Sequence, residues 1–418
     1  MRTGRPDLIR DLNRSLVRNL VRERGPLSRA ELARASGLSP STVTDITALL
    51  LREGFLLEGD GPQGDPRPTG VLGRPGIGLR VNPAAGVVIG AKVAADTVTF
   101  ALSDLAGLTL ALESRDHSSR ATVAEKVQFL AAAIDDIKAR VPAGARLHGI
   151  GLGVPGIVDP ETRRLRHSPF LGWGQDDIAG ELERRTGIAV HIDNDVNTLT
   201  IAEQLFGAGR GQQNFVVVTI GRGIGMGAVV NGLLYRGAKG GAGELGHIAV
   251  EQAGDRECWC GRSGCLETIA SEPALVRDVL SATNRLVPAE ELAASADPAV
   301  RRILARAGTL VGRAVGNMVM TFDPRLVVIS GEGVRLGPAF LAPLEAGVSR
   351  AATSADEAVQ VVIEPWGDEG WARGAASLAL RELFHPAHLR ADLGTAADVA
   401  LQSMAARDDN RSVSQKRR

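Results

Sequence analysis

The sequence predicts an α/β protein that begins with a winged helix-turn-helix and continues as a larger domain with partly parallel sheets. Two patterns lead to this prediction. Helical periodicity fills the first fifty residues and gives way to a Gly- and Pro-rich hairpin, and from residue 86 short apolar runs alternate with helical segments. At 418 residues the chain is long enough for two or three domains. We expect a first domain at residues 1–83, a second at 84–385 and a disordered tail at 386–418.

The composition excludes several classes of protein. Apolar residues make up 44% of the chain and aromatic residues only 3%, so aliphatic side chains must fill a large core. The first residues begin no apolar run and no stretch approaches twenty uncharged apolar residues, which argues against a signal peptide and a membrane span. Three clustered cysteines suit a reducing compartment better than a disulfide framework. We therefore expect a cytoplasmic protein with no membrane partner.

Three helices are expected in the first fifty residues. An apolar stripe at helical spacing predicts the first: Ile9, Leu12, Leu16 and Leu20. The second helix is expected at 27–36, because Ser28 can be its N-cap and Glu31, three residues later, completes a capping box. Gly37 suits the left-handed residue that ends such a helix, and Ser39 can cap a third helix directly afterwards.

A helix, a short turn with glycine and a second helix make the helix-turn-helix motif, whose second helix enters the major groove of DNA. The outward face of that helix would present short polar side chains to phosphates and base edges: Ser41, Thr42, Thr44, Asp45 and Thr47. Residues 1–80 hold thirteen arginines, no lysine and nine acidic residues, a net charge of +4 in a chain that is neutral as a whole. The alternative is a small helical domain with an arginine stripe that is simply solvated.

A wing is expected after the third helix. Residues 54–58 and 73–83 have the composition of two paired strands, and the segment 59–70 between them is rich in Gly and Pro. Arg74 is the candidate for insertion into an A·T-rich minor groove, because a narrow groove concentrates negative potential. Together with the local positive charge, the wing favours binding to a double-stranded DNA operator.

From residue 86 onward, strand-like and helix-like segments alternate. Strands are expected at residues 87–93, 98–103, 147–154, 189–192, 214–220 and 326–330. Helices are expected at residues 122–140, 176–185, 200–206 and 307–320. The alternation predicts partly parallel sheets, and the length of this part suits two similar lobes with a cleft between them.

All three cysteines of the chain lie within eight positions, and a histidine precedes them. His247, Cys258, Cys260 and Cys265 would offer one imidazole and three thiolates, a common ligand set for structural zinc. The alternative is three buried thiols and an unrelated histidine, which the clustering disfavours. We predict a closed zinc site.

Three other groups of residues are candidates for contacts with a ligand. Polar residues at 191–197 follow a predicted strand, where an aspartate could take a proton from a sugar hydroxyl, although Asp and Asn also cap helices. Glycines at 221–227 would let a phosphate approach the backbone, or they simply form a tight turn. Glu244 and Glu267 flank the predicted zinc site and would lie around its histidine, or they are solvated loop charges.

The chain resembles the ROK family (repressor, open reading frame, kinase). The likeness is closest over residues 232–271, which hold Glu-Leu-Gly-His and Cys-Trp-Cys-Gly-Arg-Ser-Gly-Cys-Leu-Glu, and it includes residues 151–159 and 327–333. The winged helix with its Gly-Arg-Pro wing resembles the repressor branch. The resemblance implies an actin-like, sugar-kinase-like fold of two lobes, with zinc on the four residues named above and with residues 168–173 near the ligand. It implies sugar contacts from Asn194, Asp195, Glu244, His247 and Glu267, with Asp195 where the kinases keep their base.

The departures from the kinases of this family imply that the chain is not an enzyme. Those kinases carry an Asp-x-Gly-Gly-Thr phosphate loop on the first strand, whereas this chain has Lys-Val-Ala-Ala-Asp from Lys92 to Asp96. In the second phosphate loop the usual threonine is Arg222. Phosphoryl transfer depends on positioning the phosphates and neutralising their charge, and both loops have lost parts needed for this.

We therefore predict a DNA-binding transcriptional regulator, a repressor of carbohydrate metabolism genes, that senses a sugar or sugar derivative. It would act as a homodimer or homotetramer, since helix-turn-helix proteins commonly read two half-sites. Sugar binding would act through the zinc loop on dimer packing and so on the spacing of the paired DNA-binding domains. The alternatives are an ATP-dependent sugar kinase with an appended DNA-binding domain, and a domain that responds to a protein partner.

Overall fold

The computed structural model describes residues 6–59, 77–118, 122–168, 170–351 and 359–384. Arg74, most of the Gly- and Pro-rich segment before it, and the predicted tail lie outside these ranges. Among the described helices, none is long and apolar enough to cross a membrane.

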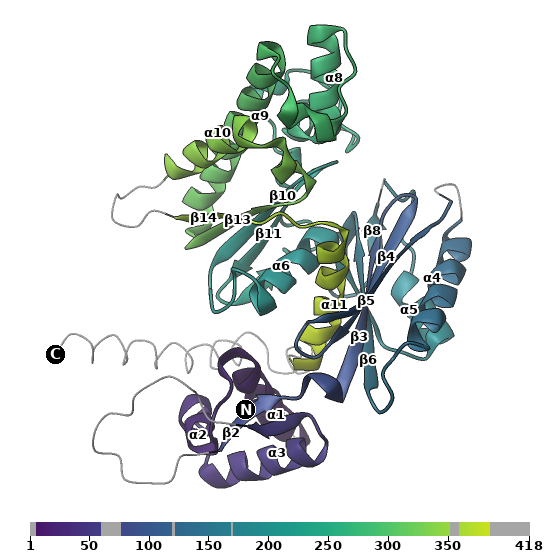
Figure 1. The fold of residues 1–418 in the computed structure, drawn as a ribbon, viewed down its shortest axis with the longest axis vertical. Helices are drawn as coiled ribbons and strands as arrows, with labels where there is room; N and C mark the ends of the chain where they lie inside the picture. Colours follow the sequence, from purple (N-terminus) through teal and green to yellow (C-terminus); the bar gives the residue numbers. More distant parts are fainter. Residues whose placement is uncertain (1–5, 60–76, 119–121, 169, 352–358, 385–418) are drawn as a thin grey trace, which may run out of the picture.

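Three helices and a two-stranded antiparallel sheet begin the chain (Figure 1). They are α1 (Pro6–Arg24), α2 (Arg29–Ser36), α3 (Pro40–Arg52), β1 (Leu56–Gly59) and β2 (Gly78–Val81). The predicted caps are present: Ser28 and Glu31 form the capping box, Gly37 has a φ of 68°, and the Ser39 hydroxyl accepts the backbone N–H of Thr42. The predicted helix-turn-helix is confirmed.

Two arginines on one face of α1, Arg14 and Arg18, contact other residues of the protein. Arg14 makes two hydrogen bonds to the carboxylate of Glu53, at 2.9 and 3.1 Å, and Arg18 lies 3.8 Å from the same carboxylate. The guanidinium of Arg18 also lies 4.7 Å from the centre of the Phe55 ring. These contacts fix α1 against the end of α3, so this part of the stripe is not a freely solvated face.

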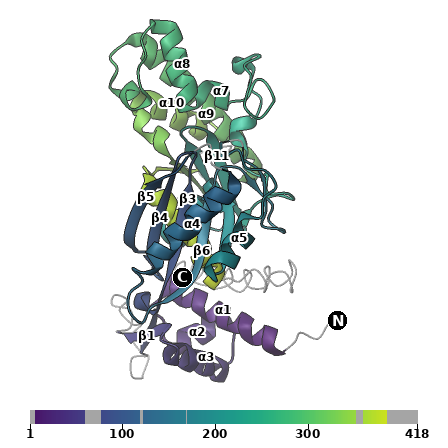
Figure 2. The ribbon, with the colours of Figure 1, turned by 90° about the vertical axis from the view of Figure 1, so that its right-hand side faces the viewer.

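Two five-stranded sheets with the same strand order make up the two lobes that follow (Figures 1 and 2). The orders are β5-β4-β3-β6-β9 and β12-β11-β10-β13-β14. In each sheet three consecutive strands form an antiparallel meander, and two parallel strands extend it on the other side. The repeated topology gives two similar lobes, as the sequence predicts.

The first lobe contains η1 (Pro83–Ala85), β3 (Gly86–Val93), β4 (Thr97–Asp104), β5 (Thr109–Asp116), α4 (Val123–Lys138), β6 (Arg146–Val154), β7 (Ile157–Val158), β8 (Leu165–His167), α5 (Ile178–Thr186) and β9 (Val190–Asn194). The second lobe contains β10 (Phe215–Ile220), β11 (Ile224–Val230), β12 (Leu233–Tyr235), η2 (Leu245–His247), η3 (Glu251–Ala253), α7 (Glu267–Ala270), α8 (Glu272–Thr283), η4 (Ala289–Ala294), α9 (Pro298–Phe322), β13 (Leu326–Ser330), η5 (Glu332–Leu336), α10 (Pro338–Ser349) and β14 (Gln360–Ile363). Two helices, α6 (Asp195–Phe206) and α11 (Asp368–Phe384), lie between the sheets (Figure 1).

Helix α11 lies directly on the first sheet because glycines leave room for its backbone. A Cβ added to Gly90 of β3 would come within 2.1 Å of the carbonyl oxygen of Ala372, and one added to Gly151 of β6 within 1.8 Å of that of Ala375. On the other side, Gly374 of α11 faces Leu199 of α6. At Gly90 and Gly151 no larger residue fits without moving the helix.

The end of α11 contacts the helix-turn-helix (Figures 1 and 2). The Phe384 ring packs edge-on against Phe55 at 5.8 Å between ring centres, and the guanidinium of Arg22 lies 5.5 Å from the Phe384 ring centre. The hydroxyl of Ser15 donates a hydrogen bond to the Phe384 carbonyl. One helix therefore runs from the region between the lobes to the helices that begin the chain.

Candidate functional site

A cavity of about 570 Å³ lies between the two lobes. Residues from the corresponding hairpin turns of the two sheets line it, between β3 and β4 and between β10 and β11, because the lobes share one topology. The five residues for which the sequence predicts sugar contacts all line this cavity: Asn194, Asp195, Glu244, His247 and Glu267.

Asp195, the first residue of α6, is held by two groups of the protein. Lys92, at the end of β3, forms an ion pair with its carboxylate, and the Val196 backbone N–H donates to the same carboxylate at 3.0 Å. The Lys92 ammonium also lies 4.3 Å from the centre of the Trp371 ring of α11. The two charged side chains are only 17% and 14% exposed, so solvent screens their attraction weakly. Lys92 thus links Asp195 to α11.

Asn194 is the N-cap of α6. Its side-chain oxygen accepts the backbone N–H groups of Val196 and Asn197, at 2.8 and 3.3 Å, and its amide nitrogen donates to the carbonyl of Gly156 at 2.9 Å. The sequence predicts a helix only from residue 200, which is wrong: α6 begins at Asp195, because the polar run that follows β9 is the cap and first turn of this helix. The cap fixes Asp195 at the edge of the cavity.

The other three predicted contacts come from the second lobe. Nε2 of His247 lies 3.6 Å from the Glu244 carboxylate. Glu267 is buried and accepts the Ile224 backbone N–H at 2.9 Å, so it is fixed against the β10–β11 turn. Burial raises the pKa of Glu244, and the nearby carboxylates of Glu267 and Asp195 raise it further. Three carboxyl groups and one imidazole therefore converge on one region, where they can accept or donate hydrogen bonds to several hydroxyl groups.

The other side of His247 belongs to a cluster with the three cysteines. Nδ1 of His247 lies 3.4 Å from Sγ of Cys258, and the Sγ atoms of Cys260 and Cys265 lie 3.7 Å apart. All four ligand atoms lie within 4.8 Å of one another. In a tetrahedral zinc site, bonds of about 2.0–2.3 Å place neighbouring ligand atoms about 3.5–3.8 Å apart. The four residues fit a metal ion of this size.

The pKa of the histidine and that of a cysteine in this cluster are shifted in opposite directions. Burial lowers the pKa of His247, which keeps its imidazole neutral, as a metal ligand must be. Burial and the neighbouring thiols raise the pKa of Cys265 to about 12. A divalent cation between these groups would favour the thiolates, which bind metals where thiols do not. The four residues could therefore hold a metal, with His247 shared between that site and the cavity.

Several residues that line the cavity were not among the predicted ligand contacts. They include Lys92 from the first lobe and Trp259 and Glu332 from the second. The sequence names Lys92 only as a lost phosphate-loop residue, since its partner Asp195 is far away along the chain. In the predicted segment 168–173, Phe170 does line the cavity, whereas Trp173 is buried in the core of the first lobe.

The predicted DNA-contacting face of α3 is present in part. Ser41, Thr44 and Asp45 are exposed and Thr42 is half-buried, with its hydroxyl 2.8 Å from that of Ser39. Thr47 is fully buried and accepts a hydrogen bond from Arg29, so the expectation that it points outward is wrong. The turn of α3 that holds Thr47 packs on α2.

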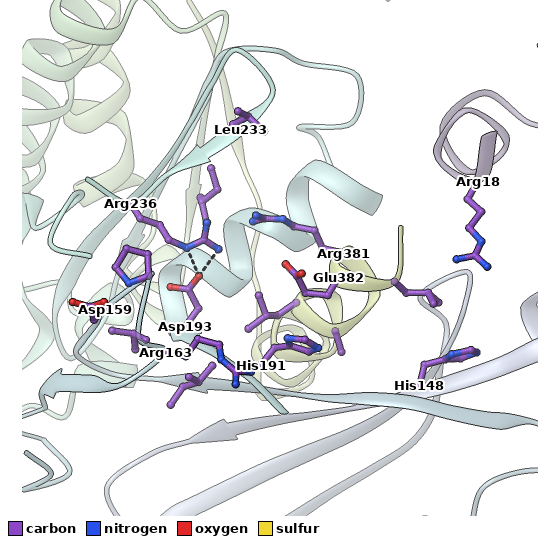
Figure 3. Close-up of a pocket in the computed structure, with 17 residues that line it drawn as sticks. Arg18, His148, Asp159, Arg163, His191, Asp193, Leu233, Arg236, Arg381 and Glu382 are labelled. Carbon is purple, nitrogen blue, oxygen red and sulfur yellow. Dashed lines mark hydrogen bonds and ion pairs between the residues drawn. The ribbon is translucent and has the colours of Figure 1, made fainter. Parts of the chain in front are cut away.

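A second groove, of about 770 Å³, lies between the first lobe, the end of α11 and the β12 region of the second lobe (Figure 3). Arg18 of α1 lines it together with His148 of β6 and Arg381 of α11. Within it Asp193 is paired with Arg236, at 2.6 and 2.7 Å. Asp193 therefore serves a structural ion pair, while its neighbour Asn194 faces the cavity between the lobes.

Comparison with known proteins identifies the family. The sequence profile of the ROK family matches residues 86–382, more than half of the chain, and that of the IclR helix-turn-helix domain matches residues 15–58. The chain belongs to the ROK family. Among solved structures, a ROK family transcriptional regulator, a homologue of the Escherichia coli MLC protein, has a TM-score of 0.78 at 26% identity. That similarity covers 90% of this chain and 97% of the regulator, so both parts of this ROK protein are matched.

Other relatives include regulators and kinases. The dual regulator NagC of Escherichia coli K12 is 29% identical, over 91% of this chain and 95% of the relative. The xylose repressor of Bacillus subtilis is 28% identical, over 89% of this chain and 96% of the relative. The ROK hexokinase from Thermus thermophilus is 30% identical with a TM-score of 0.62, over 71% of this chain and 99% of the hexokinase. The hexokinase therefore covers a smaller share of this chain than the regulators do.

The metal cluster gives a direct prediction. Purified protein should contain about one zinc ion per chain, and Cys260→Ser should reduce the metal content to near zero and lower the melting temperature, because a structural zinc site stabilises the fold around it. Ser263→Ala, in the same loop and outside the cluster, is the matched control and should keep the metal. Elemental analysis together with thermal unfolding measures both effects. Wild-type protein without metal, or a Cys260→Ser variant that keeps it, would contradict the assignment.

Proposed function

We propose that this ROK protein is a transcriptional repressor of carbohydrate metabolism genes that binds operator DNA and responds to a sugar. The observation that carries the proposal is the combination of a helix-turn-helix with a cavity between two lobes, in which five polar residues converge and Lys92 is paired with Asp195. A cavity with many hydrogen-bonding groups fits a ligand with many hydroxyls. The dual regulator NagC, a relative named N-acetylglucosamine repressor and the xylose repressor of Bacillus subtilis support the same role over nearly the whole chain.

The pairing of Lys92 with Asp195 favours sensing over catalysis. A kinase base must take a proton from a sugar hydroxyl while cations neutralise the phosphates of ATP. By the family resemblance, Lys92 stands where the kinases have a metal-binding aspartate. Its ammonium forms an ion pair with Asp195, which stands at the position of the kinase base. In the second turn a Cβ on Gly221 would come within 2.3 Å of the carboxylate of Glu332, which repels phosphate. We propose that this chain binds sugar and does not phosphorylate it.

The route from sugar to DNA is proposed to run along α11. Trp371 near its beginning touches Lys92, and Phe384 at its end touches the helix-turn-helix. A sugar that hydrogen-bonds to Asp195 competes with Lys92 and so acts on the start of this helix. A zinc ion on the four ligands would have a structural role, because it would fix His247 beside Glu244. A homodimer or homotetramer remains part of the proposal, as do the boundaries at residues 83 and 385.

Sugar binding can be tested by melting. A sugar that binds the folded state at a concentration well above its Kd should raise the melting temperature by on the order of a few degrees, and a panel of neutral and phosphorylated sugars should contain one that does. Glu244→Gln should weaken its binding about tenfold, because a charged hydrogen-bond acceptor is lost. Glu290→Gln, an exposed glutamate outside the cavity, should bind normally. A panel without effect, or ATP-dependent phosphorylation of any member, would overturn the proposal.

DNA binding can be tested with a matched pair of threonines. Thr44 in α3 and Thr321 in α9 are both exposed, and each hydroxyl donates at 2.8 Å to the carbonyl four residues earlier, so alanine changes the helix equally at both places. Thr44→Ala should weaken binding to DNA from upstream of the protein's own gene by about fivefold, and Thr321→Ala should leave it unchanged. Fluorescence anisotropy at fixed moderate salt measures both. Equal affinities of the two variants would remove α3 as the reading helix.

A further inference from the structure

Trp259 is unlike the other tryptophans of the chain. It lies between Cys258 and Cys260 of the metal cluster and is 42% exposed, whereas Trp173, Trp366 and Trp371 are between 3% and 8% exposed. It is the one exposed tryptophan of the four, and it lines the cavity between the lobes. A position beside two metal ligands also limits how far its backbone can move.

Contacts on two sides orient the Trp259 ring. The ring meets His247 at 4.5 Å between ring centres with an interplanar angle of 84°, and its indole N–H donates to the Glu267 carboxylate. Both partners belong to the polar cluster of the cavity. The ring is therefore placed at the wall of the cavity by the same groups that are expected to hold a sugar.

A second aromatic ring meets Trp259 from the other lobe. Phe170 lies in the loop between β8 and α5, and its ring centre is 5.0 Å from that of Trp259 at an interplanar angle of 61°. It is 36% exposed and lines the same cavity. Two rings that pack only to stabilise the fold would be buried by their contact. These two stay open, although they join the lobes across the cavity.

We propose that Trp259 and Phe170 form an aromatic clamp that covers the apolar face of a pyranose ring. A pyranose with equatorial hydroxyls presents hydrogen-bonding groups around its edge and C–H groups on its face, and the cavity offers the matching arrangement. Glu244, Asp195 and His247 would meet the edge, and the Trp259 ring would meet the face. Furanoses and open-chain polyols lack such a face, so the clamp selects pyranoses. This inference rests on the proposed sugar-sensing function.

Quenching of tryptophan fluorescence by acrylamide tests the clamp, because Trp259 is the one tryptophan that the quencher can readily reach. In wild-type protein a pyranose that raises the melting temperature should reduce the quenching constant about twofold or more. Trp259→Phe keeps a ring but loses the indole N–H bond to Glu267, so it should remove the quenchable signal and weaken sugar binding less than Trp259→Ala does. Trp259→Ala and Phe170→Ala should raise the Kd about fivefold to tenfold, and Phe170→Leu less.

Two controls separate the clamp from folding and from sensing itself. Zinc content should be equal in all variants, which shows that the metal loop is intact, and Leu286→Ala, an exposed apolar residue outside the cavity, should bind sugar normally. If a pyranose stabilises the protein while quenching and the Kd of Trp259→Ala stay unchanged, the clamp is wrong and the sensing function stands. If a furanose or open-chain polyol binds as tightly as any pyranose, the selectivity is wrong. If no sugar of the panel binds wild-type protein, the sensing proposal itself is overturned.

Discussion

The close packing of α11 on the first sheet is the constraint on which the rest of the structure depends. Gly90 and Gly151 remove the side chains that would otherwise separate helix and sheet, and Gly374 does the same toward α6. Interiors packed this closely move as units, because a small shift of one element meets the atoms of the next. This packing supports the proposal that a change in the position of α11 at the cavity reaches Phe384 and the helix-turn-helix. A looser contact would absorb the same change locally.

The cavity and the metal cluster share one histidine, and this sharing organises the second half of the site. One nitrogen of His247 faces Cys258 and the other faces Glu244. A metal ligand is held more rigidly than a free side chain, so a residue that contacts both a metal and a small molecule is a fixed wall for the latter. The Trp259 ring packs edge-to-face against the imidazole of the same histidine. In the proposed sensor, the segment from His247 to Glu267 would carry both the polar and the aromatic groups that contact the sugar.

Local features of this chain could be predicted from the sequence, and long-range ones could not. The capping box of Ser28 and Glu31 and the cysteine cluster lie within a few residues along the chain, so spacing alone carries their geometry. The family resemblance added the five cavity residues, which come from both lobes. The ion pair of Lys92 with Asp195 joins residues about a hundred positions apart, and no pattern in the sequence announces it.

Two local predictions were wrong, the start of α6 and the outward direction of the Thr47 side chain. The start of α6 was placed too late because the polar run was assigned to ligand contact, with helix capping only as the alternative. Asn194 in fact caps the helix by accepting the backbone N–H groups of Val196 and Asn197. Thr47 was expected to face outward together with the other short polar side chains of α3. The hydrogen bond from Arg29 and the packing of α2 turn it inward. In the second case a tertiary contact decided the direction of the side chain.

The proposed function requires that one equilibrium couple the cavity to the DNA-binding helices, and reciprocal linkage makes this coupling measurable. The measurement is the Kd of an effective sugar for the free protein and for the protein saturated with operator DNA. We expect the two Kd values to differ by about fivefold or more, the usual size of an allosteric coupling. Their ratio should equal the factor by which the same sugar changes the affinity for DNA. Equal Kd values for the free and the DNA-bound protein would mean that sugar binding does not affect DNA binding, and would overturn the proposed coupling.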